Sequence, residues 1–184
     1  MKTFFATLFV LTACTIQAQS TWKLDSGHSS INFSVSHLVI SEITGSFDQF
    51  DITAITGDDF SNPKFDVSIK TASINTNNSQ RDNHLRADDF FYAEQHPTIT
   101  FKNSSVKKTG DKTFAITGNL TVKGITKEVT FNGTLNGILK TDRGEKAGLK
   151  LTTTINRTDF KVGGGMSSIG EDVMVVINLE MGKQ

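Results

Sequence analysis

Hydrophobic and polar residues alternate with a period of two along most of this chain. Such alternation is typical of β-strands that bury one face and expose the other to water. The alternation occurs in eight segments and is less regular in 46–55 than in the others. The segments are 31–39, 46–55, 65–69, 99–101, 114–122, 129–135, 147–155 and 173–181. We therefore predict an all-β fold with eight strands.

The connections between these segments favour an antiparallel arrangement. Lys123-Gly124 and Asp142-Arg143-Gly144 have the composition of hairpin turns. Strands with one polar face that are joined by short turns suit a closed barrel, because closure leaves no exposed edges. Two connections are longer, 75–97 and 158–170. The first should hold a short helix, with Ser79 and Asp82 at N-cap and N3 spacing.

An eight-stranded barrel either fills its interior with side chains or encloses one small ligand. Gly118, Gly133 and Gly137 are in phase with the inward apolar residues, and they indicate either barrel corners or an unfilled tunnel. The apolar candidates for the lining share the inward phase or, for the Phe-Phe pair, a place at the barrel rim. They are Ile31, Phe33, Val35, Phe65, Val67, Ile69, Phe90, Phe91, Phe101, Phe114, Ile116, Phe131, Leu149, Leu151, Ile155, Val175 and Ile177.

The 75–97 connection contains the most distinctive run of the chain, RDNHLRADDFF at residues 81–91. Shorter motifs accompany it in order: Trp22 to Asp25, His28-Ser29, Phe33 to His37, Gly45 to Phe47, Ser73 to Thr76, His96 to Phe101, Gly118 to Lys127 and Asn156 to Phe160. Together they resemble the YceI-like family of lipocalin-like, polyisoprenoid-binding proteins, whose hallmark reads RDxHLRxxDFF. The resemblance covers about residues 22–181, nearly the whole chain after its N-terminal segment.

The resemblance implies a lipocalin-like barrel that binds, transports or sequesters a long isoprenoid, either a polyprenyl phosphate or a quinone, without catalysis. The inward apolar residues would contact the tail, and the lipid itself would be the only ligand, with no cofactor. Transient contact with a membrane would follow. The matching candidates for the headgroup are His37, Arg81, Asp82, His84, Arg86 and Arg157. The chain departs from the family pattern at Tyr92, Lys161 and the loop at Gly163–Gly165.

Each polar candidate also has a structural interpretation. A buried guanidinium is costly without a partner, so Arg157 either meets an acid such as Asp159 or Asp82 or faces a headgroup. On a helix, Asp82 and Arg86 have the spacing of a local ion pair. Arg could equally hold a phosphate, since its planar fork binds two oxygens at once.

Other classes of function have weaker support. The chain has no G-x-S-x-G elbow, and its four histidines lack the spacing of a metal site, although His28 and His37 could converge across strands. The main alternative is a ligand-free structural or stress-related interaction module with a packed core. Met174 and Val176 fall on the outward face, where either the 75–97 segment covers them or they form a homodimer seam.

The N-terminal residues 1–18 are predicted to be a signal peptide, with Lys2 as their only charge and an apolar run too short to span a bilayer. A lipoprotein anchored through Cys14 is the alternative. Residues 19–184 would form a single periplasmic or secreted domain. Without residues 1–18 the chain has 18 basic and 19 acidic residues, a net charge of −1, which argues against nucleic-acid binding.

Overall fold

A computed structural model describes residues 19–57 and 60–184, so the predicted signal peptide and Cys14 lie outside the described residues. The strands are β1 (Ser20–Leu24), β2 (Ser30–His37), β3 (Ser41–Phe47), β4 (Phe50–Thr56), β5 (Lys64–Lys70), β6 (Ile74–Asn75), β7 (Thr98–Lys108), β8 (Thr113–Val122), β9 (Ile125–Thr141), β10 (Gly144–Asn156) and β11 (Ile169–Lys183). The helices are α1 (Ser79–Leu85) and three short 3-10 helices, η1 (Ser26–His28), η2 (Thr71–Ser73) and η3 (Arg157–Phe160). Within the described ranges, no helix has the length and hydropathy of a membrane-spanning segment.

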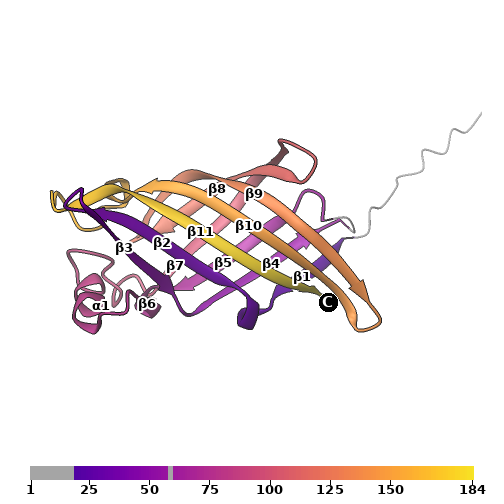
Figure 1. The fold of residues 1–184 in the computed structure, drawn as a ribbon, viewed down its shortest axis with the longest axis horizontal. Coiled ribbons are helices and arrows are strands. Elements are labelled where there is room, and N and C mark those ends of the chain that lie inside the picture. Colours follow the sequence, from indigo (N-terminus) through magenta and orange to yellow (C-terminus); the bar gives the residue numbers. More distant parts are fainter. Residues whose placement is uncertain (1–18, 58–59) are drawn as a thin grey trace, which may run out of the picture.

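The strands form a closed antiparallel barrel (Figure 1). Eight strands complete the ring in the order β1-β4-β5-β7-β8-β9-β10-β11, and β11 pairs back with β1. Strands β2 and β3 extend the wall beyond the ring, where β2 pairs with the first part of β11 and with β3. The predicted eight-stranded barrel with a short helix in the 75–97 connection is confirmed.

Three details differ from the predicted strands. The segment 46–55 is divided between β3 and β4 rather than forming one strand. Strand β2 ends at His37, so Val39 lies in a tight turn and is 93% exposed instead of facing inward. The N-cap of α1 is Asn78, whose side chain accepts a hydrogen bond from the Arg81 backbone N–H, and not Ser79.

The three glycines in the inward phase do not form a tunnel. A side chain on Gly118 would meet the backbone of Asn103, where β7 carries a bulge, so this glycine marks a barrel corner. Gly133 lies beneath the Phe114 ring. Gly137 is exposed, because the register shift at Gly148 moves it out of phase.

One end of the barrel, which we call the closed end, is tightly packed. The indole of Trp22 on β1 is fully buried, and it packs edge-to-face on Phe60 with ring centroids 5.3 Å apart. Ala147, Leu149 and Met181 are equally inaccessible. Small and large residues interdigitate here, as in a well-packed core.

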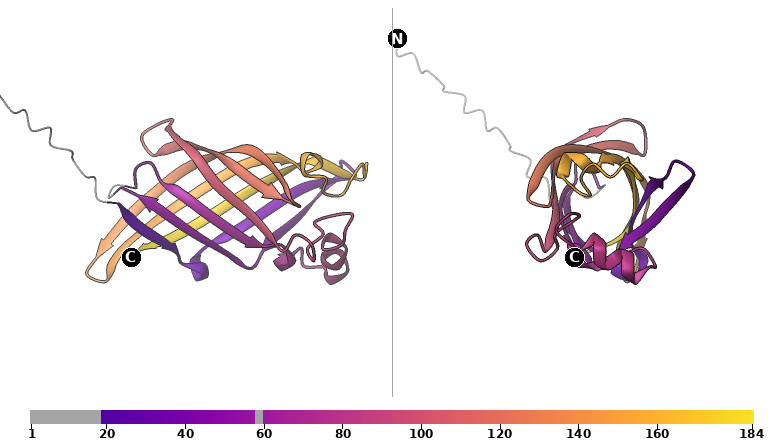
Figure 2. Two further views of the ribbon diagram at one scale, coloured as in Figure 1. Left: turned by 180° about the vertical axis from the view of Figure 1, so that it is seen from behind. Right: turned by 90° about the vertical axis from the view of Figure 1, so that its left-hand side faces the viewer.

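The opposite end, which we call the mouth, is bounded by α1, the β2–β3 turn at residues 38–40 and the loop at residues 161–168 (Figures 1 and 2). Hydrogen bonds join the loop to the segment after α1, directly and through Lys123 of the β8–β9 turn. The Gly163 N–H donates to the Asp89 carbonyl at 2.9 Å, and the Lys123 ammonium donates to the carbonyls of Asp88 and Lys161. The mouth is therefore built from three connections that are distant in the sequence.

Candidate functional site

The barrel encloses an apolar cavity of about 440 Å³ between the mouth and the closed end. Along β11 the lining runs from Ile169 to Leu179. A ten-residue step along a strand tilted as in most barrels corresponds to roughly 25 Å of barrel axis. The volume lies in the range of small-molecule sites. The interior is thus packed at one end and hollow toward the other.

Most of the predicted lining residues face this cavity. They are Ile31, Phe33, Val35, Phe65, Val67, Ile69, Phe90, Phe91, Phe101, Ile116, Phe131, Leu151, Ile155, Val175 and Ile177. Phe114 and Leu149 were assigned to the lining incorrectly. Phe114 covers Gly133, and Leu149 is fully buried opposite Leu179 toward the closed end.

Several lining residues were missed, most of them because they lie in irregular segments or beyond the predicted strand limits. They are Ile43, Phe47, Ile52, Ile74, Leu85, Ile99, Leu120, Val122, Phe160, Val162, Met166, Ile169, Val173 and Leu179. Ile99, Leu120, Val122, Val173 and Leu179 continue the period-two pattern and could have been included from it.

The segment after α1 forms an aromatic lid over the cavity. Phe91 packs edge-to-face on Phe47 of β3 at 5.9 Å, and Phe47 contacts Phe33 of β2 at the same separation. Phe90 is buried and packs against the His84 ring at 4.9 Å. Gly163 lies directly against Phe90 with φ of +71°, where a side chain would collide with the ring. Phe90 and Phe91 therefore lie at the barrel rim, where the sequence placed them.

Most of the charged side chains around α1 hold the helix in place. Asp82 is buried, and its carboxylate accepts hydrogen bonds from the Thr76 N–H at 2.8 Å and the Thr76 hydroxyl at 2.6 Å. Arg86 donates to the carbonyls of Ala72 and Ile74. Neither Asp82 nor Arg86 lines the cavity, and they do not form the predicted ion pair with each other. The cavity lining therefore does not support the headgroup role predicted for them.

Arg157 lines the cavity, but its guanidinium is fully engaged by the mouth loop and the start of β11. Its side chain is buried, and its five N–H groups donate to five backbone carbonyls at distances from 2.7 to 3.1 Å. The acceptors are Val162, Gly164, Met166, Ile169 and Gly170. The expected acidic partner, Asp159 or Asp82, is not used. Since guanidinium has five N–H donors, none remains for a headgroup.

Arg81, His84 and His37 are the other polar candidates that line the cavity. Arg81 donates its Nε–H and one Nη2–H to the Thr76 hydroxyl and carbonyl at 2.8 Å. Its Nη1 group has no partner among the described residues, so three of its five N–H donors are unused. His84 lies 2.8 Å from Asp89. Arg81 is therefore the cavity arginine that can still bind an anionic group.

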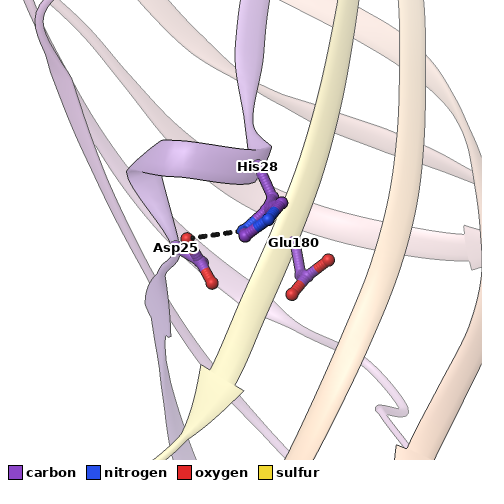
Figure 3. A group of neighbouring side chains, drawn as sticks. All are labelled: Asp25, His28 and Glu180. Carbon is purple, nitrogen blue, oxygen red and sulfur yellow. Dashed lines mark ion pairs between the residues drawn. The ribbon is translucent and has the colours of Figure 1, made fainter.

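A second polar cluster lies near the closed end. Asp25, His28 and Glu180 each place one ligand-type atom within 4.8 Å of the others (Figure 3). The Lys146 ammonium lies 3.1 Å from Asp25 Oδ2 and 2.6 Å from Glu180 Oε1. Since this ammonium already supplies positive charge to both carboxylates, we interpret the group as an ion-pair network between β10, β11 and the end of β1. His28 and His37 lie at opposite ends of β2 and do not converge.

This network makes a prediction about pH. Hydrogen bonds from Lys146, and to a lesser extent from His28, lower the pKa of Asp25 below 3.8. The hydrogen bonds that Lys146 donates to Glu180, and to a lesser extent to Asp25, raise the pKa of Lys146 above 10.5. The Asp25 contribution to stability should therefore be present above pH 3.8 and be lost as pH falls through the lowered pKa. The Lys146 contribution should be lost as pH rises past the raised pKa. Replacing Lys146→Ala should return the Asp25 pKa toward 3.8, measured by NMR titration of the carboxyl carbon; an unchanged pKa would contradict the network.

Comparison with known proteins identifies relatives along nearly the whole described chain. Residues 22–181 match the sequence model of the YceI-like domain. A UPF0312 protein of Staphylococcus aureus, SA2479, is 42% identical over 145 residues, which are 77% of this chain and 81% of that protein. The resemblance predicted from the 81–91 run and its accompanying motifs is confirmed.

Solved structures agree with this result. The YceI protein of Campylobacter jejuni is 34% identical with a TM-score of 0.74, over 81% of this chain and 90% of that one. BcnA of Burkholderia cenocepacia shares the fold at 21% identity, with a TM-score of 0.78 over 85% of this chain and 98% of BcnA. A Saccharophagus degradans domain described as polyisoprenoid binding shares it at 16% identity, with a TM-score of 0.69 over 89% of this chain and 98% of the domain.

Proposed function

The chain belongs to the YceI-like family, and on this basis we propose that its barrel binds an amphiphilic isoprenoid lipid without catalysing a reaction. The tail would occupy the apolar cavity, and the headgroup would lie at the mouth near Arg81. The observation that carries the proposal is the cavity itself, hollow over roughly 25 Å and lined almost entirely by aliphatic and aromatic side chains. The polyisoprenoid-binding description of the Saccharophagus degradans domain supports this class of ligand.

The shape of the cavity favours a long tail over a compact ligand. Its lining continues along β11 from the mouth loop to Leu179, and the closed end beyond it is packed around Trp22. A lipid tail would therefore enter only at the mouth, and its far end would stop at the packed closed end. We further propose that residues 1–18 direct export, so that the protein meets its ligand in the cell envelope.

Arg81 is the residue expected to distinguish headgroups. Its unused Nη1 group could donate two hydrogen bonds to a phosphate, where the negative charge of the acceptor adds to the positive charge of the donor. A quinone carbonyl is neutral and gains less from the same donor. The geometry therefore favours a polyprenyl phosphate at Arg81, with a quinone as the neutral alternative.

Replacing Arg81→Gln should weaken binding of a polyprenyl phosphate by about tenfold and change quinone affinity by less than about threefold. Both constants can be measured by isothermal titration calorimetry in detergent at fixed salt. Arg143→Gln, an exposed arginine in the β9–β10 turn, is the control. An equal loss for both ligands would remove Arg81 from the headgroup site. No binding of either ligand by the unmodified protein would overturn the proposed function.

A further inference from the structure

Three consecutive aliphatic residues lie at the tip of the β2–β3 hairpin. Leu38 is 54% exposed, Val39 93% and Ile40 85%. An exposed aliphatic side chain is common on its own, whereas a cluster of adjacent ones at a projecting turn indicates an interaction site. The hairpin extends past the barrel wall at the mouth (Figure 2).

The backbone of this turn does not favour the residues it contains. Leu38 and Val39 have φ angles of +50° and +63°. Glycine and asparagine adopt this left-handed region readily, and a β-branched residue rarely does. Folding of the turn therefore gives no reason for valine at this position, and the apolar side chains need another explanation.

The tip lies beside the mouth loop, which lines the apolar cavity. The Leu38 N–H donates to the Ser168 carbonyl at 2.9 Å, which fastens the hairpin to the mouth loop. On the same loop, Met166 both lines the cavity and is 40% exposed. Leu38, Val39, Ile40 and Met166, which we call the apolar tip, thus place hydrophobic surface beside the entrance to the interior.

We infer that the apolar tip inserts into the surface of a lipid bilayer, so that the mouth faces the membrane when a lipid enters or leaves. This inference rests on the proposed function. Four side chains are too few for a stable protein partner, which needs about 800 Å² from each side. Fluid acyl chains can surround a projecting tip, whereas a protein partner would need a groove that matches it. Aliphatic side chains at the headgroup boundary are typical of proteins that bind membrane surfaces.

The charge around the tip specifies the kind of membrane binding. The hairpin itself carries no basic residue, since residues 24–63 contain no Lys or Arg, and Glu42 follows the turn closely. Elsewhere at the mouth, Lys123 and Arg81 already donate hydrogen bonds to protein oxygens. Electrostatic attraction to anionic lipids requires clustered basic residues. Binding should therefore depend on hydrophobic insertion, and neither salt nor anionic lipid should strengthen it.

The test is flotation of the purified protein with phosphatidylcholine vesicles, with and without anionic lipid. Replacing Leu38→Asn together with Val39→Gly suits the left-handed backbone, so the variant should fold at least as well as the original. Its partition onto vesicles should fall by at least about tenfold, because two aliphatic side chains no longer leave water. Leu139→Asn, which changes a residue 60% exposed on β9 toward the closed end, should leave partition unchanged.

Quinone binding in detergent separates the two hypotheses. If the double variant binds quinone normally and vesicles poorly, the inference is supported. If the unmodified protein binds quinone but not vesicles, the inference is overturned and the proposed function stands. Equal vesicle partition of the double variant and the original would also overturn it, as would a dimer that the double variant converts to monomer without any vesicle binding. Absence of quinone and polyprenyl phosphate binding would reject the proposed function instead.

Discussion

Replacing Arg157→Met should lower the free energy of unfolding by at least about 3 kcal/mol, because five backbone carbonyls of the mouth loop and the start of β11 lose their donor together. For a chain of this size the melting temperature should fall by about 6–12 °C. Urea denaturation and thermal unfolding measure the two quantities. Lysine, a compact ammonium with three donors, should rescue only part of the loss.

The matched control is Arg143→Met, which removes an exposed arginine from the β9–β10 turn at the opposite end. Its stability should change by less than about 0.5 kcal/mol. If Arg157→Met were as mild as the control, the hydrogen bonds to the loop would not stabilise the fold. A variant that kept its stability but lost only phosphate binding would restore Arg157 to the headgroup site.

Placing a tryptophan at Val175 should abolish isoprenoid binding. Val175 on β11 lines the cavity between Ile169 at the mouth and Leu179 near the closed end, so an indole there would obstruct the path of the tail. Loss of the deeper half of the apolar contact should reduce affinity by at least about 100-fold. The detergent titration of quinone and polyprenyl phosphate would show it, because the effect should be the same for both headgroups.

The next residue provides the control. Val176 lies on the outer face of the same strand beside Met174, and Val176→Trp adds the same side chain outside the cavity. It should leave both affinities unchanged. Urea denaturation of the two variants tests whether binding is lost because the protein unfolds. Overpacking of a filled core typically costs about 1–3 kcal/mol, and this is the loss of stability to look for. Equal binding by the two variants would place the ligand outside the barrel.

The neighbouring valines also show how far the sequence determines the fold. The period-two pattern places Val175 inside and Val176 outside correctly, because each side chain is oriented by the strand alone. It fails where the ladder is irregular. Gly137 lies opposite a register shift, and Val39 follows the end of β2, so both leave the expected phase.

The polar candidates were harder to predict for a different reason. The inward position of Arg157 follows from the strand that precedes it, but its partners are backbone carbonyls of a loop, and these carry no side-chain signal. Lys161 is comparable. It occupies a left-handed position with φ of +54° at the end of η3, a conformation that glycine adopts more readily than lysine.

The proposed function requires that the hollow part of the barrel hold an isoprenoid lipid. The decisive experiment is native mass spectrometry of the protein purified from its own host's envelope fraction, followed by solvent extraction. We predict one additional mass per chain, released on extraction and identified as a polyprenyl phosphate or an isoprenoid quinone. A mass equal to that of the protein alone, with no uptake when both lipids are added back, would contradict it.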